Sequence, residues 1–123
     1  DYATQLTTAA SRDVSRIAAS TSDEGMFLPC MVGQLEGQFL KMFVETARAK
    51  TVLDIGTFTG YSALSFAEGL PADGTLVTVE NDERIAAVAK QCFDASAHAA
   101  KIDLRVGNAP AILEELASDG RTF

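Results

Sequence analysis

Apolar residues recur every three or four positions in several stretches of the chain, and each such stretch predicts an amphipathic helix. These helices are expected over residues 3–19, 36–49 and 61–68, from about 82 to 97, and from 110 onward. Three shorter runs, rich in β-branched and apolar residues, predict strands over residues 51–55, 75–79 and 102–106. This alternation is typical of an α/β fold in which crossover helices connect parallel strands.

Polar, glycine and proline residues separate these elements. The run from Ser20 to Asp23 should end the first helix, and the segment around Pro29 should form a loop, because proline restricts its own backbone and that of the residue before it. A turn from Pro71 to Gly74 precedes the second strand. We therefore expect an N-terminal helix and loop over residues 1–30, followed by the alternating part over residues 31–123.

The stretch from Thr51 to Ser62, Thr-Val-Leu-Asp-Ile-Gly-Thr-Phe-Thr-Gly-Tyr-Ser, joins a strand to a helix through a glycine-bearing turn. Glycine lets the backbone approach a bound nucleotide-like ligand closely, so this turn is a candidate ligand loop. A tight turn packed under the sheet, with no ligand, would have the same pattern. More distant residues must decide between the two interpretations.

Composition and charge narrow the class of protein. The 123 residues are 47% hydrophobic and 22% charged, which fits one globular domain. Ten basic and 17 acidic side chains give a formal charge of -7, which disfavours binding to nucleic acid. Cys30 and Cys92 have no paired spacing, and no apolar run approaches the length of a membrane span. We expect a cytoplasmic protein with no disulfide, no zinc cluster and no membrane partner.

The alternating pattern stops where a further strand would be due, since the sequence ends at Phe123. Three strands with their crossover helices make up the first half of a doubly wound sheet, and the first strand would lie at its open edge. We therefore expect this chain to be a fragment or a cleaved product of a longer protein.

Polar groups should meet at the carboxyl ends of the three strands, which is where open α/β sheets bind ligands. These groups are Asp54, the loop from Gly56 to Gly60, Glu80, and Asn108 with Ala109. Glu80 follows Gly56 by 24 positions (80 − 56), close to the roughly 20 expected for an acid that accepts hydrogen bonds from a ribose. A solvated acid near the next helix N-terminus is the alternative for Glu80.

The chemistry of the loop favours one kind of nucleotide-like ligand. Its sequence Gly-Thr-Phe-Thr-Gly lacks the Gly-x-Gly-x-x-Gly pattern of pyrophosphate binders, and no lysine or arginine stands nearby to meet a phosphate. An adenosyl ligand with an amino-acid tail and a sulfonium charge needs close backbone approach and carboxylates, and Asp54 and Glu80 supply them. We therefore predict S-adenosylmethionine as the cofactor.

Four short motifs then resemble one known family in order and spacing. They are Met31-Val32 followed by Gly37-Gln38-Phe39-Leu40, the run from Asp54 to Ser62, Lys101-Ile102-Asp103, and Gly107-x-Ala109. From about residue 31 onward, the chain resembles the cation-dependent, caffeoyl-CoA-type O-methyltransferases, a family that also resembles catechol O-methyltransferase. The resemblance implies a Rossmann-like class I methyltransferase fold and a homodimer.

The resemblance also implies which residues bind the cofactor. They are Val32 lining the site, Asp54, Gly56, Thr57 and Ser62 at the methionine portion, Glu80 at the ribose and Ala109 beside the adenine. Asp54 stands where the family often has Glu, and Glu80 where it often has Asp, so the charge is kept while the reach changes by one methylene. The family's metal-binding carboxylates would begin beyond Phe123, so we name neither a metal ligand nor a catalytic residue in this chain.

Together these features predict an O-methyltransferase that moves the methyl of S-adenosylmethionine to a hydroxyl of a small, catechol-like acceptor. A divalent cation such as Mg²⁺ is expected to assist in the full-length protein, and residues 1–30 are expected on the acceptor side. This chain alone would then be inactive. Two alternatives stay open: methylation of a tRNA base hydroxyl by the same broad family, and a truncated chain that only binds ligand or pairs with a partner.

Overall fold

Three parallel strands form the centre of the structure, a computed structural model that describes residues 2–123. The strands are β1 (Thr51–Ile55), β2 (Thr75–Glu80) and β3 (Ile102–Val106), in the spatial order β1-β2-β3. The α-helices are α1 (Tyr2–Leu6), α2 (Arg12–Asp23), α3 (Gln34–Ala47), α4 (Tyr61–Gly69), α5 (Glu83–Asp94) and α6 (Ala109–Ser118). Two short 3-10 helices span Leu28–Cys30 and Ala99–Lys101. The predicted α/β fold with three parallel strands is confirmed.

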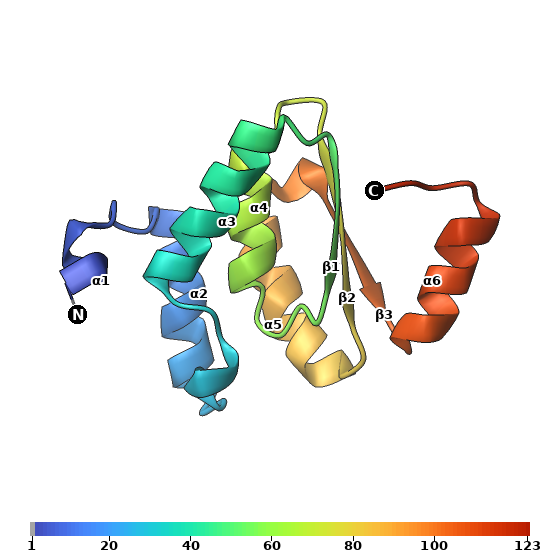
Figure 1. The fold of residues 1–123 in the computed structure, drawn as a ribbon. Helices are drawn as coiled ribbons and strands as arrows, with labels where there is room; N and C mark the ends of the chain where they lie inside the picture. The colour runs from blue at the N-terminus through green and yellow to red at the C-terminus, as the bar shows by residue number, and fades with distance from the viewer. Residues whose placement is uncertain (1) are drawn as a thin grey trace.

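Helices cover both faces of the sheet (Figure 1). The helices α4 and α5 pack on one face, with α2 and α3 against them, and α6 lies on the other face. Alternate side chains of β2 enter two separate cores, because successive side chains of a strand point to opposite faces. Leu76 packs with the α4 side, whereas Val77 and Val79 pack against Ile112 of α6.

Within residues 2–123, β1 has a strand neighbour on one side only. It pairs with β2 in parallel register from Thr51 opposite Thr75 to Ile55 opposite Val79. Ile55 is accordingly 56% exposed, although its sequence context is that of a buried strand. The first strand therefore lies at an open edge of this sheet, as the sequence pattern predicts.

The N-terminal segment differs from its prediction. The expected single helix over residues 3–19 is divided in two, because Ser11 begins a new helix by accepting a hydrogen bond from the Val14 amide at 3.1 Å. The helix α2 then continues through residues 20–23, which the sequence predicts to be a break. Thr21 is tolerated there because its hydroxyl donates to the Ile17 carbonyl of the preceding turn at 2.7 Å.

The helices α3 and α4 approach each other closely at Gly37. A β-carbon on this glycine would lie 2.7 Å from the Tyr61 ring and 2.8 Å from the Ser65 hydroxyl oxygen. Both neighbours are buried, so neither can move aside freely. This contact fixes the position of α3 against α4, and with it the position of the segment before α3.

Across the described residues, no helix combines the length and apolar character required to cross a lipid bilayer.

We expect Gly37→Ala to lower the free energy of unfolding by about 1–2 kcal/mol, because overpacking of the α3–α4 contact outweighs the better helix propensity of alanine. Thermal or urea unfolding would measure the change. Gly33→Ala is the matched control, since a β-carbon at Gly33 has nothing within 4 Å. Equal stability of the two variants would contradict this account of the contact.

Candidate functional site

The loop that follows β1 turns over the end of β2 and leaves open space beside its first glycine. The amides of Gly56 and Thr57 both donate to the Val79 carbonyl, at 2.9 and 3.0 Å. Gly56 has a φ of 96°, a conformation that favours glycine, and a β-carbon there would meet nothing within 4 Å. No side chain covers the backbone on this side of Gly56, which fits close approach by a ligand.

The other side of the loop is held by buried groups. The hydroxyls of Thr57 and Thr78 lie 2.7 Å apart, and Thr59 is fully buried. At Gly60 a β-carbon would lie 2.5 Å from the Phe93 ring, and φ is 99°. The loop therefore packs tightly against the protein on one side and is open on the other.

Asp54 presents a carboxylate at the end of β1. Its Oδ2 accepts hydrogen bonds from the Thr78 hydroxyl at 3.0 Å and from the Ser62 hydroxyl at 3.1 Å. Among residues 2–123, no cationic side chain forms an ion pair with Asp54, and Oδ1 has no hydrogen-bond donor. Oδ1 is therefore available to a ligand, and a cationic group is the best complement to it.

Burial raises the pKa of Asp54 above its ordinary value, and the hydrogen bonds from Thr78 and Ser62 oppose that increase. A carboxylate with a raised pKa and no cationic partner is costly to the folded protein and is characteristic of binding sites. A bound ammonium group would supply the missing counter-charge.

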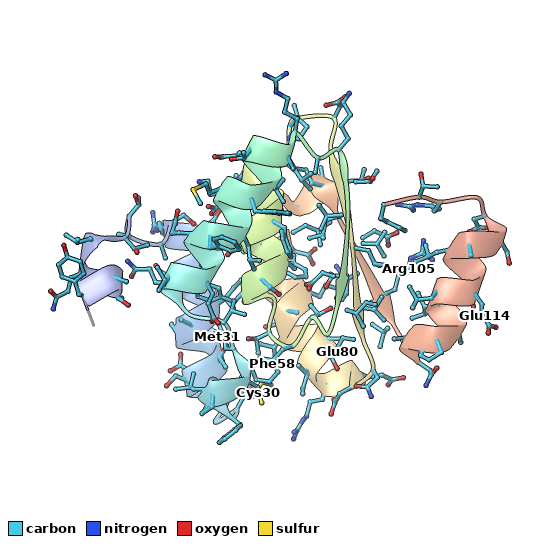
Figure 2. All side chains as sticks on the ribbon, viewed as in Figure 1. Cys30, Met31, Phe58, Glu80, Arg105 and Glu114 are labelled. Atoms are coloured by element: carbon cyan, nitrogen blue, oxygen red, sulfur yellow. The ribbon has the colours of Figure 1, made fainter. Side chains whose placement is uncertain are left out.

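Glu80 lies at the end of β2, where three backbone amides surround its carboxylate. Oε1 accepts from Asn81 and Asp82 at 2.9 and 3.0 Å, and Oε2 accepts from Phe58 at 2.8 Å. Phe58 has a left-handed backbone with φ of 49°, which is unfavourable for a residue with a side chain. Glu80 thus holds the loop in shape in addition to facing the site. Figure 2 shows Glu80 and Phe58 close together at the same end of the sheet as Cys30 and Met31.

Two cavities meet at Gly56. The larger, about 300 Å³, is bounded by the ends of β1 and β2 and the start of α6, and Glu80 and Ala109 line it. The smaller, about 60 Å³, lies between the loop and the segment before α3, and Val32, Thr57 and Ser62 line it. One continuous ligand could therefore pass across Gly56 from one cavity into the other.

The structure brings the seven predicted cofactor-binding residues to this one region. Six of them line the two cavities, and Asp54 is joined to the region through Ser62. Thr57 is predicted at the methionine portion, and in the structure its residue is 1% exposed while its hydroxyl is bonded to Thr78 inside the protein. Its backbone, rather than its side chain, is what the site can offer a ligand.

Sequence reasoning did not identify Thr78 as part of the site. In a strand, threonine is common for its β propensity alone, so its sequence position carries no signal of a link to Asp54. Its only connection to the site in the sequence is its place two positions before Glu80, on the same face of β2. The Phe58 amide was also missed, because only the left-handed backbone brings it to Glu80.

The described residues do not form a site that fits a divalent cation. Over residues 2–123, no three His, Cys, Asp or Glu side chains are grouped so that they could hold a metal ion. Asp54 and Glu80 already bind hydroxyl and amide donors, as described above.

A family model described as O-methyltransferase matches residues 8–123. A catechol O-methyltransferase from Niastella koreensis is 34% identical over 109 residues, which cover 88% of this chain and 49% of the relative. Caffeoyl-CoA O-methyltransferase 1 from Zea mays is 37% identical over 84 residues, covering 68% of this chain and 33% of the relative.

Solved structures share the fold as well. The O-methyltransferase TomG from Streptomyces achromogenes, solved in complex with SAM, superposes with a TM-score of 0.88 at 29% identity. The superposition covers 98% of this chain and 54% of TomG. The chain thus spans about half the length of the Niastella koreensis relative and of TomG, and about a third of the maize relative.

Proposed function

Because the chain belongs to this O-methyltransferase family and has its Rossmann-like fold, we propose that it forms the S-adenosylmethionine site of an enzyme that methylates a hydroxyl of a small, catechol-like acceptor. The observation that carries the proposal is the pair of cavities that meet at the bare backbone of Gly56. The cofactor in the TomG structure supports the choice of ligand.

The shape and chemistry of the site fit the parts of this cofactor. Its ammonium group would bind to Asp54, whose Oδ1 is available, and its adenosine would occupy the larger cavity beside Ala109. Glu80 would accept a ribose hydroxyl on Oε2, which has one hydrogen bond from the protein and room for another. The methionine portion would cross Gly56 toward Val32 and Ser62.

When bound, S-adenosylmethionine supplies a methyl group activated by a sulfonium centre. The acceptor oxygen would form a bond to the methyl carbon as the carbon–sulfur bond breaks, which would leave the sulfur as a neutral thioether, and the hydroxyl proton would pass to water. The residues described here contribute binding and orientation, which suffices for much of the rate enhancement of a direct displacement. Because no metal-binding group is present among them, no part of the step is assigned to a cation.

The acceptor class rests on the relatives, which are named for catechol and caffeoyl-CoA. We further propose that assistance by a divalent cation, a dimeric assembly and a cytoplasmic location hold for the whole enzyme. The tRNA alternative is disfavoured by the formal charge of -7.

Calorimetric titration tests the cofactor. We expect S-adenosylmethionine to bind with heat and with a stoichiometry of one per chain, and NAD to show no binding, because the loop has neither the glycine pattern nor a cation for a pyrophosphate. The same titrations on a protein of the relatives' length, with and without Mg²⁺ and a catechol, test the acceptor and the cation. Absence of S-adenosylmethionine binding in both proteins would refute the proposed function.

A further inference from the structure

Thr21 connects the N-terminal helix α2 to the ligand loop from inside the protein. Its hydroxyl oxygen lies 2.7 Å from that of Thr59, the residue between Phe58 and Gly60 in the loop. Both threonines are 0% exposed, so no water competes for this bond. The hydrogen bond links residues 38 positions apart.

The directions of the bonds around this hydroxyl are constrained. A threonine hydroxyl carries one proton, and the Ile17 carbonyl, 2.7 Å from Thr21 Oγ1, can only accept. Thr21 therefore donates to Ile17, and the Thr59 hydroxyl donates to Thr21. In this arrangement the Thr59 side chain has its partner only because α2 presents an oxygen at this point.

The same hydroxyl also touches the opposite wall of the smaller cavity. The Met31 sulfur lies 3.6 Å from Thr21 Oγ1, and Met31 lines that cavity with its neighbours Cys30 and Val32. The loop wall of the cavity is formed by Thr57 and Phe58, directly before Thr59. One buried oxygen atom of α2 thus contacts both of the chain segments whose separation sets the width of this cavity.

From this geometry we infer that Thr21 is a positioning residue for the cofactor site. It holds the ligand loop and the segment before α3 at the separation that the methionine portion of the cofactor requires. The inference rests on the proposed function. It assigns the N-terminal helix a part in cofactor binding, whereas the sequence alone places residues 1–30 on the acceptor side.

The experiment uses variants that separate positioning from stability. Thr21→Val keeps the shape of the side chain but removes the oxygen, which leaves the buried Thr59 hydroxyl without a partner. Thr21→Val combined with Thr59→Val removes both hydroxyls, and loss of both partners is tolerated far better than loss of one. Thr21→Ser retains the oxygen.

We expect Thr21→Val to raise the Kd for S-adenosylmethionine about tenfold, because the unliganded loop spends less time in the competent position, and to lower the Tm. The double variant should regain most of the Tm but keep the raised Kd, since the tether is still missing. Thr21→Ser should restore both values. Ser118→Ala is the control: it removes a hydroxyl bonded at 2.8 Å to the Glu114 carbonyl within α6, and Ser118 lines neither of the two cavities.

Hydrogen exchange on the ligand-free protein gives a second readout that needs no cofactor. The amides of Thr57 and Gly60 are bonded to the carbonyls of Val79 and Thr57, and both should exchange faster in the double variant than in wild type. A Kd that follows Tm back to the wild-type value, or exchange that is unchanged, would overturn the inference. If neither wild type nor the protein of the relatives' length binds S-adenosylmethionine, the proposed function fails, and the exchange rates alone then decide whether Thr21 positions the loop.

Discussion

Replacing Asp54 with asparagine should raise the Tm of the protein while weakening its binding of S-adenosylmethionine by about a hundredfold. The asparagine oxygen can still accept the hydrogen bonds that Thr78 and Ser62 donate to Asp54. The variant carries no charge, however, so the penalty of burying an unpaired carboxylate is removed. The same charge is what an ammonium group would bind, so stability and binding should change in opposite directions.

The pH dependence gives this prediction a sign that can be checked. The pKa of Asp54 is raised in the folded protein, chiefly by burial, so the folded state holds this proton more tightly than the unfolded chain does. The ionised carboxylate therefore destabilises the fold above the raised pKa. This destabilisation is lost as the pH falls through the raised pKa toward the ordinary value. Below the ordinary value of 3.8, Asp54 is neutral in both states. The Tm advantage of Asp54→Asn should be largest near neutral pH and should vanish in acid.

Thermal melts across this pH range and calorimetry at neutral pH would measure both effects. Asp94→Asn is the control, because the Asp94 side chain is 62% exposed and pairs with Lys90 at the surface, where such pairs contribute little. An Asp54→Asn protein with a Tm below that of wild type would contradict the proposed effect on stability. A Kd for the cofactor equal to that of wild type would contradict the proposed effect on binding.

Glu80→Ala is expected to weaken cofactor binding by more than a hundredfold and also to lower the free energy of unfolding by about 2 kcal/mol. The predicted place of Glu80 at the ribose accounts for the loss of affinity. The structure adds the destabilisation, since the Phe58 amide would lose its acceptor and the unfavourable backbone of Phe58 would lose its support. Glu83→Ala, an exposed acid in the first turn of α5, is the control.

A ligand lacking one hydroxyl separates the two roles of Glu80. If Glu80 binds the ribose, 2′- or 3′-deoxy forms of the cofactor should bind wild type more weakly than the parent compound. They should bind Glu80→Ala no more weakly than the parent, because the partner of the missing hydroxyl is gone. A deoxy penalty of the same size in both proteins would mean that Glu80 supports the loop without touching the ribose.

Much of the fold follows from local sequence. The strands over residues 51–55 and 102–106 match the structure at both ends, because short β-branched runs bounded by turns have few other solutions. The N-terminal helices could not be predicted correctly, because the break at Ser11 depends on a capping bond and the helical state of Thr21 on a bond within α2. Both bonds are made by residues that are equally common in loops.

The residues of the candidate site also divide into those that local sequence identifies and those that only the structure identifies. Asp54 and Glu80 are identifiable because they lie at the carboxyl ends of predicted strands, and Gly56 because glycine permits the turn. The contributions of Thr78 and Thr21 depend on which side chains meet in three dimensions. Sequence spacing carries no record of such contacts, so the residues that support the site were found only in the structure.

The ligand loop is held by parts of the chain that are far apart in sequence: Thr21 in α2, Val79 in β2 and Phe93 in α5. Contacts between distant segments form slowly during folding, because long stretches of chain must first be ordered. The helices can form from local contacts well before these three segments meet around the loop. Regained cofactor binding is therefore a stricter measure of complete refolding than regained helix content.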